Sequence, residues 1–235
     1  LGDSARQMQT GADALTQAVT RTRSAPGGTV RVSASDVAAT WLLTPLLARL
    51  AQDEPGLQVE LVVSNQLSNL LKREADIALR MLRPAQASLT ARKLGEVAIA
   101  ACAHEHYLAA AGTPRRAEDL ARHRLIGYDR DDTILRGFAA LGFPIGRAQF
   151  ALRTDNQVTY GQWVAAGAGI GFLAHYHAAL LPGVRIVLPA LRIPPLPCWL
   201  AVHREIRGNR LVRRVWDYLA EAVPAAIAEG ESKSR

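Results

Sequence analysis

The sequence predicts a mixed α/β fold in which two lobes enclose a ligand cleft. Residues 29–80 alternate apolar, strand-like runs with helical runs, and this order requires a parallel sheet. The same alternation starts again after residue 103, which indicates a second lobe. Carboxyl ends of parallel strands meet helix N-termini at one edge of a sheet, so we expect a small molecule to bind there.

The first lobe is expected to begin after a linker. Residues 3–23 have the spacing of an amphipathic helix, but their apolar face is too narrow to make an isolated helix stable. Residues 24–28 end this helical pattern and form the linker. The runs that follow predict strand 30–35, a leucine-faced helix ending before Pro55, strand 57–63, helix 67–72, strand 75–79, and strands 89–94 and 97–102. The first three strands are separated by helices and should therefore lie parallel.

The second lobe should extend from residue 101 to residue 199. Its expected elements are helices 104–111, 117–122 and 157–166 and strands 124–128, 149–154, 170–173 and 184–188. A proline-rich stretch then precedes strand 198–203 and a helix, residues 209–223, with one apolar face. The simplest arrangement has two crossings between the lobes, near residues 100 and 200, and the last helix returns to the first lobe.

Composition indicates a globular protein without a membrane span. The 235 residues are 49% hydrophobic and 21% charged. The longest nearly apolar stretch, residues 164–174, is much shorter than the roughly 20 residues that cross a bilayer, and residence in the cytoplasm is favoured. The net charge of +7 comes from scattered arginines, which is a weak indication of direct DNA contact. Cys102 and Cys198 lie in apolar runs and are expected to be small buried hydrophobes without a disulfide.

Several strings occur along the chain in a characteristic order: VRVSAS, LLTPLLARLAQDEPGLQVEL, ADIALR, SLTARKLGEVAIAACAHEHYLAAAGTP, DLARHRLIGY, TDN, VAAGAGIGFL and VHREIRGNRLVRRVWDYL. Together they resemble the effector-binding domain of LysR-type transcriptional regulators over residues 28–223. Residues 3–23 resemble the end of the linker helix that, in this family, leads from an N-terminal winged helix-turn-helix and pairs with a second chain.

The resemblance implies a periplasmic-binding-protein-like (type 2) fold with a central cleft for a small-molecule effector. It also implies a cytoplasmic homodimer or homotetramer that binds DNA through the winged helix-turn-helix, a module absent from this chain. The expected division is residues 1–27 as the linker helix end and linker, residues 28–100 plus 200–230 as the first lobe, and residues 101–199 as the second. No cofactor, metal site or catalytic residue is expected.

Polar residues at the ends of the first three strands are candidate effector ligands. Ser35 and Asp36 follow the first strand, where they either cap the next helix or face the ligand. Capping is favoured for Asp36, because an anion there would oppose a carboxylate ligand. The family often has a small hydroxyl residue slightly further on, where this chain has Val37 and Ala38, and this departure puts a general carboxylate-binding site in doubt.

The second and third strands end in further polar side chains. These are Ser64, Asn65 and Gln66 after the second strand and Arg80 at the end of the third. The first three match a family position that donates a polar contact to the effector, although serine and asparagine also form simple turns. Arg80 either pairs with an anionic effector or is a solvated or interlobe salt-bridge residue, and the structural role is favoured.

Three residues of the second lobe complete the predicted site. Cys102 ends a strand where a helix begins, Asn156 lies at a turn that the family places in the pocket wall, and His175 follows strand 170–173. A helix cap is the alternative for Asn156, and a histidine with a structural role is the alternative for His175.

Enzymatic function is not supported by the motifs. HEH (104–106) and HYH (175–177) place histidines two residues apart, unlike the four-residue spacing of a zinc-protease helix. No G-x-S-x-G elbow or Walker loop occurs, and GAGIG (167–171) follows a helix instead of opening one. Two alternatives share the two-lobed architecture: an exported, monomeric solute-binding protein of a transport system, and an enzyme such as a dehydratase.

Overall fold

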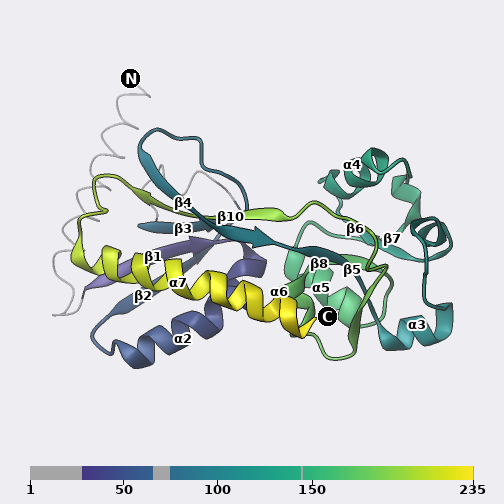
Figure 1. Cartoon of the computed structure of the whole chain (residues 1–235), viewed down its shortest axis with the longest axis horizontal. Coiled ribbons are helices and arrows are strands. Elements are labelled where there is room, and N and C mark those ends of the chain that lie inside the picture. Colours follow the sequence, from purple (N-terminus) through teal and green to yellow (C-terminus); the bar gives the residue numbers. More distant parts are fainter. Residues whose placement is uncertain (1–27, 66–74, 144, 235) are drawn as a thin grey trace, which may run out of the picture.

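A computed structural model describes residues 28–65, 75–143 and 145–234 of the chain (Figure 1). The predicted linker helix over residues 3–23, the predicted helix over residues 67–72, and Gln66 lie outside these described residues. The strands of these described residues form three sheets, with the orders β2-β1-β3-β10-β4, β8-β5-β9 and β6-β7. We call the five-stranded sheet with its covering helices lobe I, and the other two sheets with their helices lobe II.

Lobe I has a parallel centre, as the sequence predicts. Strand β1 (Thr29–Ala34) pairs in parallel with β2 (Gln58–Val63) and β3 (Ile77–Arg80). The sheet is completed by β10 (Leu196–His203), which runs antiparallel to both β3 and β4 (Leu89–Val97). The antiparallel half was not predicted, because β10 arrives from lobe II more than a hundred residues after β3.

Helices with apolar faces cover this sheet. The predicted leucine-faced helix is a π-helical turn, η1 (Ala38–Leu43), that continues into α2 (Thr44–Asp53). The face is confirmed, since Leu42, Leu43, Leu46 and Leu50 are buried in the lobe I core together with Leu219 of the last helix. Strands and helices of this lobe therefore share one core.

The last helix, α7 (Arg210–Lys233), is longer than predicted. The prediction that it ends at Val223 was wrong, because the helix continues through Pro224. A proline removes one backbone hydrogen bond, but Val223 and Ile227 are buried on either side of it and hold the helix in place. Near its end α7 packs against α6 (His175–Ala178) of lobe II (Figure 1). At this contact the Tyr176 backbone lies so close to Gly230 that any side chain at position 230 would collide with it.

Lobe II contains the remaining strands, in two sheets, and several short helices. In its larger sheet, β5 (Ile99–His104) pairs antiparallel with β8 (Gly171–Ala174) and β9 (Val184–Val187). In the smaller sheet, β6 (Leu125–Gly127) and β7 (Phe150–Arg153) are parallel. Its helices are α3 (Glu105–Ala111), η3 (Ala117–Arg122), α4 (Thr133–Ala140), η4 (Arg147–Gln149), α5 (Gln157–Ala165) and α6.

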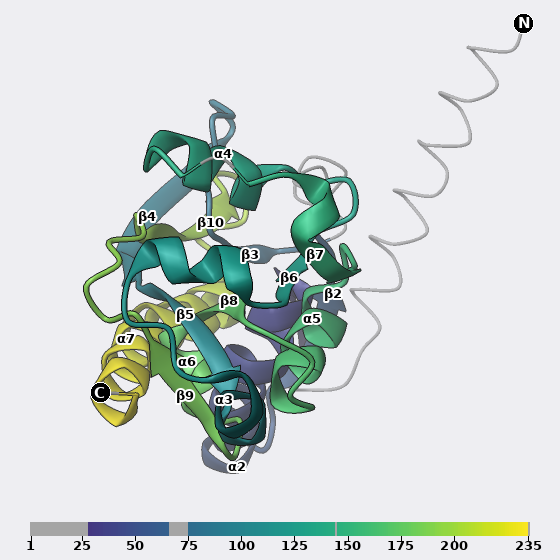
Figure 2. The same cartoon turned by 90° about the vertical axis from the view of Figure 1, so that its right-hand side faces the viewer.

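Three helical segments of lobe II, α4, η4 and α6, were not predicted. All are short, and glycine interrupts the apolar pattern of α4. Seen along the long axis of the molecule, α4 and α3 lie at opposite ends of the lobe (Figure 2). The chain passes from β4 to β5 at Ala98 and re-enters the lobe I sheet with β10, so two connections join the lobes.

Both cysteines occupy the predicted buried positions. Cys102 lies in the core of lobe II and Cys198 in the core of lobe I, and both are fully buried. Burial raises the pKa of each thiol to about 12. Among the described residues, no helix combines the length and the apolar character needed to cross a membrane.

A candidate ligand cleft between the lobes

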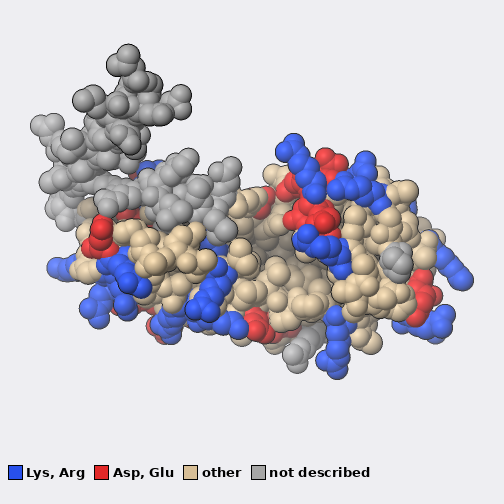
Figure 3. Space-filling view, turned by 90° about the horizontal axis from the view of Figure 1, so that it is seen from above, with Lys and Arg blue, Asp and Glu red and all other residues tan. Residues whose placement is uncertain are grey.

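A cleft of about 520 Å³ lies between the lobes, at the carboxyl ends of the parallel strands of lobe I. Viewed from above, it is the hollow between the two halves of the molecule, and charged side chains gather on its lobe II rim (Figure 3). Both lobes line it, with Ser35, Ser64, Asn65, Arg80, Met81 and Leu82 on one side, Tyr128, Arg130, Asp131, Asp155 and Gln157 on the other, and Leu196 from β10.

A smaller chamber of about 90 Å³ adjoins the cleft. It shares Ser35, Met81, Tyr128, Gln157 and Leu196 with the cleft, so the two spaces are neighbours. The rest of its lining is mainly apolar and aromatic, with Val37, Val97, Ile99, Tyr160, Phe172, Leu173, Ala174, Tyr176 and His177. A ligand in the cleft therefore meets polar groups outside and apolar groups inside.

The predicted residues at the end of β1 cap the helical segment that follows. The Val37 N–H donates to Asp36 Oδ1 over 2.8 Å, and the Ala38 N–H donates to Ser35 Oγ over 3.4 Å. Asn65, at the end of β2, accepts from the Asp36 N–H over 3.3 Å through Oδ1. The structure thus brings Ser35, Asp36 and Asn65 together, and Ser64 beside them lines the cleft.

Asp36 also connects the two lobes. Its Oδ2 atom accepts a hydrogen bond of 3.2 Å from the Gln157 N–H, at the start of α5 in lobe II. The two residues are 121 positions apart in sequence. One carboxylate therefore contacts the N-terminal ends of two helices, one from each lobe.

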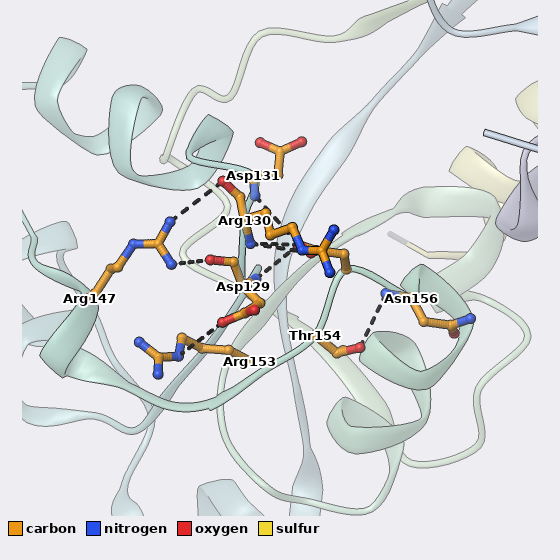
Figure 4. Close-up of polar contacts among 8 residues, drawn as sticks. Asp129, Arg130, Asp131, Arg147, Arg153, Thr154 and Asn156 are labelled. Atoms are coloured by element: carbon orange, nitrogen blue, oxygen red, sulfur yellow. Dashed lines mark hydrogen bonds and ion pairs between the residues drawn. The ribbon is translucent and has the colours of Figure 1, made fainter. Parts of the chain in front are cut away.

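Asn156 is the N-cap of α5. Its Oδ1 atom accepts from the Thr159 N–H over 2.7 Å, and its own N–H donates to Thr154 Oγ1 over 3.1 Å (Figure 4). It directly precedes Gln157, but its own side chain is not part of the cleft lining. Its geometry is that of the capping alternative.

We expect Asn156→Ala to lower the free energy of unfolding by about 1 kcal/mol, because it leaves the Thr159 N–H without its capping acceptor. Urea unfolding followed by circular dichroism measures this loss. Asn156→Ser is the matched control, since its hydroxyl still accepts at an N-cap, and its loss should be smaller. Equal stability of the alanine variant and the wild type would contradict the capping role.

Asp155 accepts hydrogen bonds from a second set of backbone donors, on the lobe II rim of the cleft. Its Oδ1 atom accepts from the N–H groups of Asp129, Arg130 and Asp131 over 3.0, 2.9 and 3.4 Å. The hydrogen bonds from these backbone N–H groups lower the pKa of the Asp155 carboxyl, and the bond from Arg130 has the largest effect. The Arg130 guanidinium adds an ion pair of 3.8 Å.

Two arginines support the same turn. Arg147 donates to the Asp129 and Arg130 carbonyl oxygens, and Arg153 lies 3.9 Å from the Asp129 carboxylate (Figure 4). The segment of Asp129 to Asp131 is therefore held from several directions, and the rim it forms is a defined wall of the cleft.

Arg80 reaches the cleft, but its guanidinium is bonded inside lobe I. The residue is 7% exposed, and its side chain donates to the Ser33 carbonyl over 2.9 Å and to Ser33 Oγ over 2.8 Å. A further bond of 2.9 Å goes to the Leu79 carbonyl. Burial lowers the pKa of this guanidinium. These contacts fit the structural alternative, while effector contact by Arg80 stays a prediction.

Two predicted site residues lie away from the cleft. Cys102 is fully buried, and its thiol donates to the Ala100 carbonyl over 3.5 Å, because strand alternation turns the side chain into the lobe II core. His175 lies beside the end of α7, where its Nδ1 atom is 2.7 Å from Ser234 Oγ. It lines a different hollow together with Lys233. The structure does not bring either residue to the effector cleft.

The sequence prediction missed the aromatic side of the cleft. Tyr128 follows β6 and lies with its ring centroid 5.0 Å from that of Tyr160. Tyr160 is fully buried, donates to the Ile126 carbonyl over 3.1 Å and accepts from the Phe172 N–H over 2.9 Å. The strand-end rule that selected Ser35 and Ser64 would also have selected Tyr128, since it follows a parallel strand. Among the described residues, no group of three or more His, Cys, Asp or Glu side chains could hold a metal ion.

Comparison with known proteins gives one consistent family. The family model described as LysR substrate binding domain matches residues 23–224. The HTH-type transcriptional activator AaeR of Escherichia coli (strain K12) is 30% identical over 208 residues, which cover 83% of this chain and 66% of AaeR. CrgA, an HTH-type transcriptional regulator of Neisseria meningitidis serogroup C (strain 8013), is 36% identical over 103 residues, which cover 44% of this chain and 34% of CrgA. The chain thus spans just under two thirds of AaeR.

Solved structures show the same fold. The regulatory domain of CrgA from Neisseria meningitidis has a TM-score of 0.73 and 26% identity, with 84% of this chain and 100% of that chain covered. Full-length AphB, a virulence activator of Vibrio cholerae, has a TM-score of 0.73 and 20% identity, with 92% of this chain and 76% of that chain covered. The similarity extends over both lobes and supports the two-lobed, periplasmic-binding-protein-like fold.

Proposed function

This chain belongs to the LysR substrate-binding domain family, and on that premise we propose that it is the effector-sensing part of a DNA-binding transcription regulator. The observation that carries the proposal is the interlobe cleft, to which both lobes contribute polar and apolar side chains. An occupant of this cleft contacts both lobes and stabilises one relative arrangement of them over others. Such a ligand changes the shape of the domain and can return to solution chemically unaltered.

The signal would reach DNA through other parts of the whole protein. In this proposal, the lobes are residues 28–100 plus 200–230 and residues 101–199, and residues 1–27 connect them to a winged helix-turn-helix. The protein acts in the cytoplasm as a homodimer or homotetramer, without enzymatic turnover. The names of AaeR and CrgA, both HTH-type transcriptional regulators, support this assignment.

The cleft assignment is tested by a thermal-shift screen of small metabolites against this chain. A ligand at about 100 times its Kd stabilises the folded state by about 2.7 kcal/mol, which is a clear shift in melting temperature. Ser64→Ala should reduce the shift, because Ser64 lines the cleft. Ser88→Ala is the matched control, since Ser88 precedes β4, is also partly exposed and does not line the cleft. Its shift should equal that of the wild type.

Three results would count against the proposal. A selective ligand whose shift is the same in Ser64→Ala and the wild type would move the binding site out of the cleft. Chemical conversion of the ligand, detected by chromatography after incubation, would indicate an enzyme. A full-length protein whose DNA footprint and scattering profile are both unchanged by the ligand would remove the regulatory role.

A further inference from the structure

The helix N-termini that face the cleft have their backbone donors already bonded to the protein itself. Such N–H groups attract anions, including ligand carboxylates. In lobe I, Val37 and Ala38 donate to Asp36 and Ser35. In lobe II, the Gln157 N–H donates to Asp36, and the Thr159 N–H donates to the side chain of Asn156. An anionic ligand would have to displace these contacts.

Asp36 is the central residue of this arrangement. Its two carboxylate oxygens separately contact the helical segment after β1 and the first residue of α5. A ligand carboxylate that joined the two lobes through helix N-termini would need this same position. The protein's own carboxylate therefore fills the position in which an anion would receive the most favourable backbone contacts.

The second set of donors on the cleft wall is filled in the same way. The N–H groups of Asp129, Arg130 and Asp131 converge on Asp155, which itself lines the cleft. Three consecutive N–H groups directed at one oxygen form an anion-binding concavity. The anion held in this concavity is again a carboxylate of the protein itself, that of Asp155.

The cleft has no excess of positive charge in its lining that would attract an anion. Its lining contains Asp131 and Asp155 against Arg80 and Arg130, and Asp36 adds a third carboxylate. Arg80 is bonded to Ser33, and Arg130 pairs with Asp155. Burial raises the pKa of the Tyr128 phenol to about 12, and the charges of Asp131 and Asp36 contribute to the rise.

We propose that Asp36 determines ligand specificity, so that the cleft excludes anions and takes a neutral or cationic small molecule with an apolar part for the inner chamber. This inference rests on the proposed effector-binding function and specifies its ligand class. Two like charges a few ångströms apart repel strongly in a partly desolvated site, so a carboxylate should bind at least about tenfold more weakly than a neutral analogue.

Benzylamine, benzyl alcohol and benzoate form a suitable probe set, since they share one ring and differ in charge. Titrations into the ¹⁵N-labelled chain, followed by NMR, measure a Kd for each from the resonances of cleft residues. In the wild type, benzyl alcohol and benzylamine should shift these resonances, and benzoate should bind at least about tenfold more weakly. Asp36→Asn should bring benzoate to within about threefold of benzyl alcohol.

Two control variants locate the effect. Asp217→Asn makes the same change in net charge on the exposed side of α7, where Asp217 pairs with Arg213, and should leave the ratio of the Kd values unchanged. Leu196→Trp should abolish the binding of every probe, because Leu196, which is 40% exposed, lines both the cleft and the chamber.

Benzoate that binds the wild-type cleft as tightly as benzyl alcohol would overturn the inference while leaving the proposed effector-binding function intact. The wild-type comparison decides this even if Asp36→Asn fails to fold. An unchanged ratio in folded Asp36→Asn would remove Asp36 as the cause. If no probe shifts a cleft resonance of the wild type, the cleft does not accept such ligands, and the proposed function loses its support as well.

Discussion

Tyr160→Phe is expected to lower the free energy of unfolding by about 3 kcal/mol, because it leaves a buried donor and a buried acceptor unpaired at once. The Tyr160 hydroxyl donates to the Ile126 carbonyl and accepts from the Phe172 N–H, so it joins β6 and β8 to α5. The residue is 1% exposed and belongs to the lobe II core. Burial keeps the hydroxyl protonated, since it raises the pKa of Tyr160 well above the usual value.

Urea unfolding monitored by fluorescence gives the magnitude of this loss. Tyr218→Phe is the matched control, because the Tyr218 hydroxyl donates a single bond, to the Leu46 carbonyl, and the residue is partly exposed. Its loss should stay at about 1 kcal/mol or below. If both variants lose the same amount, the two bonds of Tyr160 do not act as a buried connection between the strands.

The sequence predicts most of lobe I because the information there is local. Strand β1 and the buried leucines of η1 and α2 follow from apolar runs and helical spacing, and the parallel pairing of β1, β2 and β3 follows from the order of the elements. The antiparallel strand β10 did not follow, since its partners precede it by more than a hundred residues. The length of α7 was also missed, because burial beyond Pro224 outweighs the local preference of proline.

The candidate site was predictable only in part, for the same reason. The strand-end rule places Ser35, Ser64 and Asn65 at the cleft. The hydrogen bond from Gln157 to Asp36 was not foreseeable, because it depends on how two lobes meet. Cys102 shows the effect of a misplaced strand end: β5 continues to His104, so Cys102 lies within the strand and its side chain points into the core.

Lowering the pH from 6.5 to 5 should reduce the free energy of unfolding by about 2 kcal/mol through His177 alone. His177 is 1% exposed, and its ring stacks on that of Trp41 from lobe I at a centroid distance of 5.0 Å. Within the described part of the chain, its Nε2 atom has no hydrogen-bond partner. Burial lowers the pKa of His177 from 6.5 to about 4.

The sign of the effect follows from which state takes up the proton first. Above pH 6.5 the imidazole is neutral in both the folded and the unfolded state, and the free energy of unfolding has its full value. As the pH falls from 6.5 towards 4, the unfolded chain binds a proton that the folded chain excludes, and unfolding becomes easier by about 1.4 kcal/mol per pH unit.

Urea unfolding of the wild type and His177→Leu between pH 7.5 and 5 isolates this contribution. Leucine cannot titrate, so the variant should lose about 2 kcal/mol less than the wild type over the lower part of this range. His106→Leu is the control, because His106 is exposed, and its profile should run parallel to that of the wild type. Parallel profiles for His177→Leu and the wild type would show that the imidazole beside Trp41 accepts a proton as easily in the folded protein as in water, and that the stack between the lobes tolerates its charge.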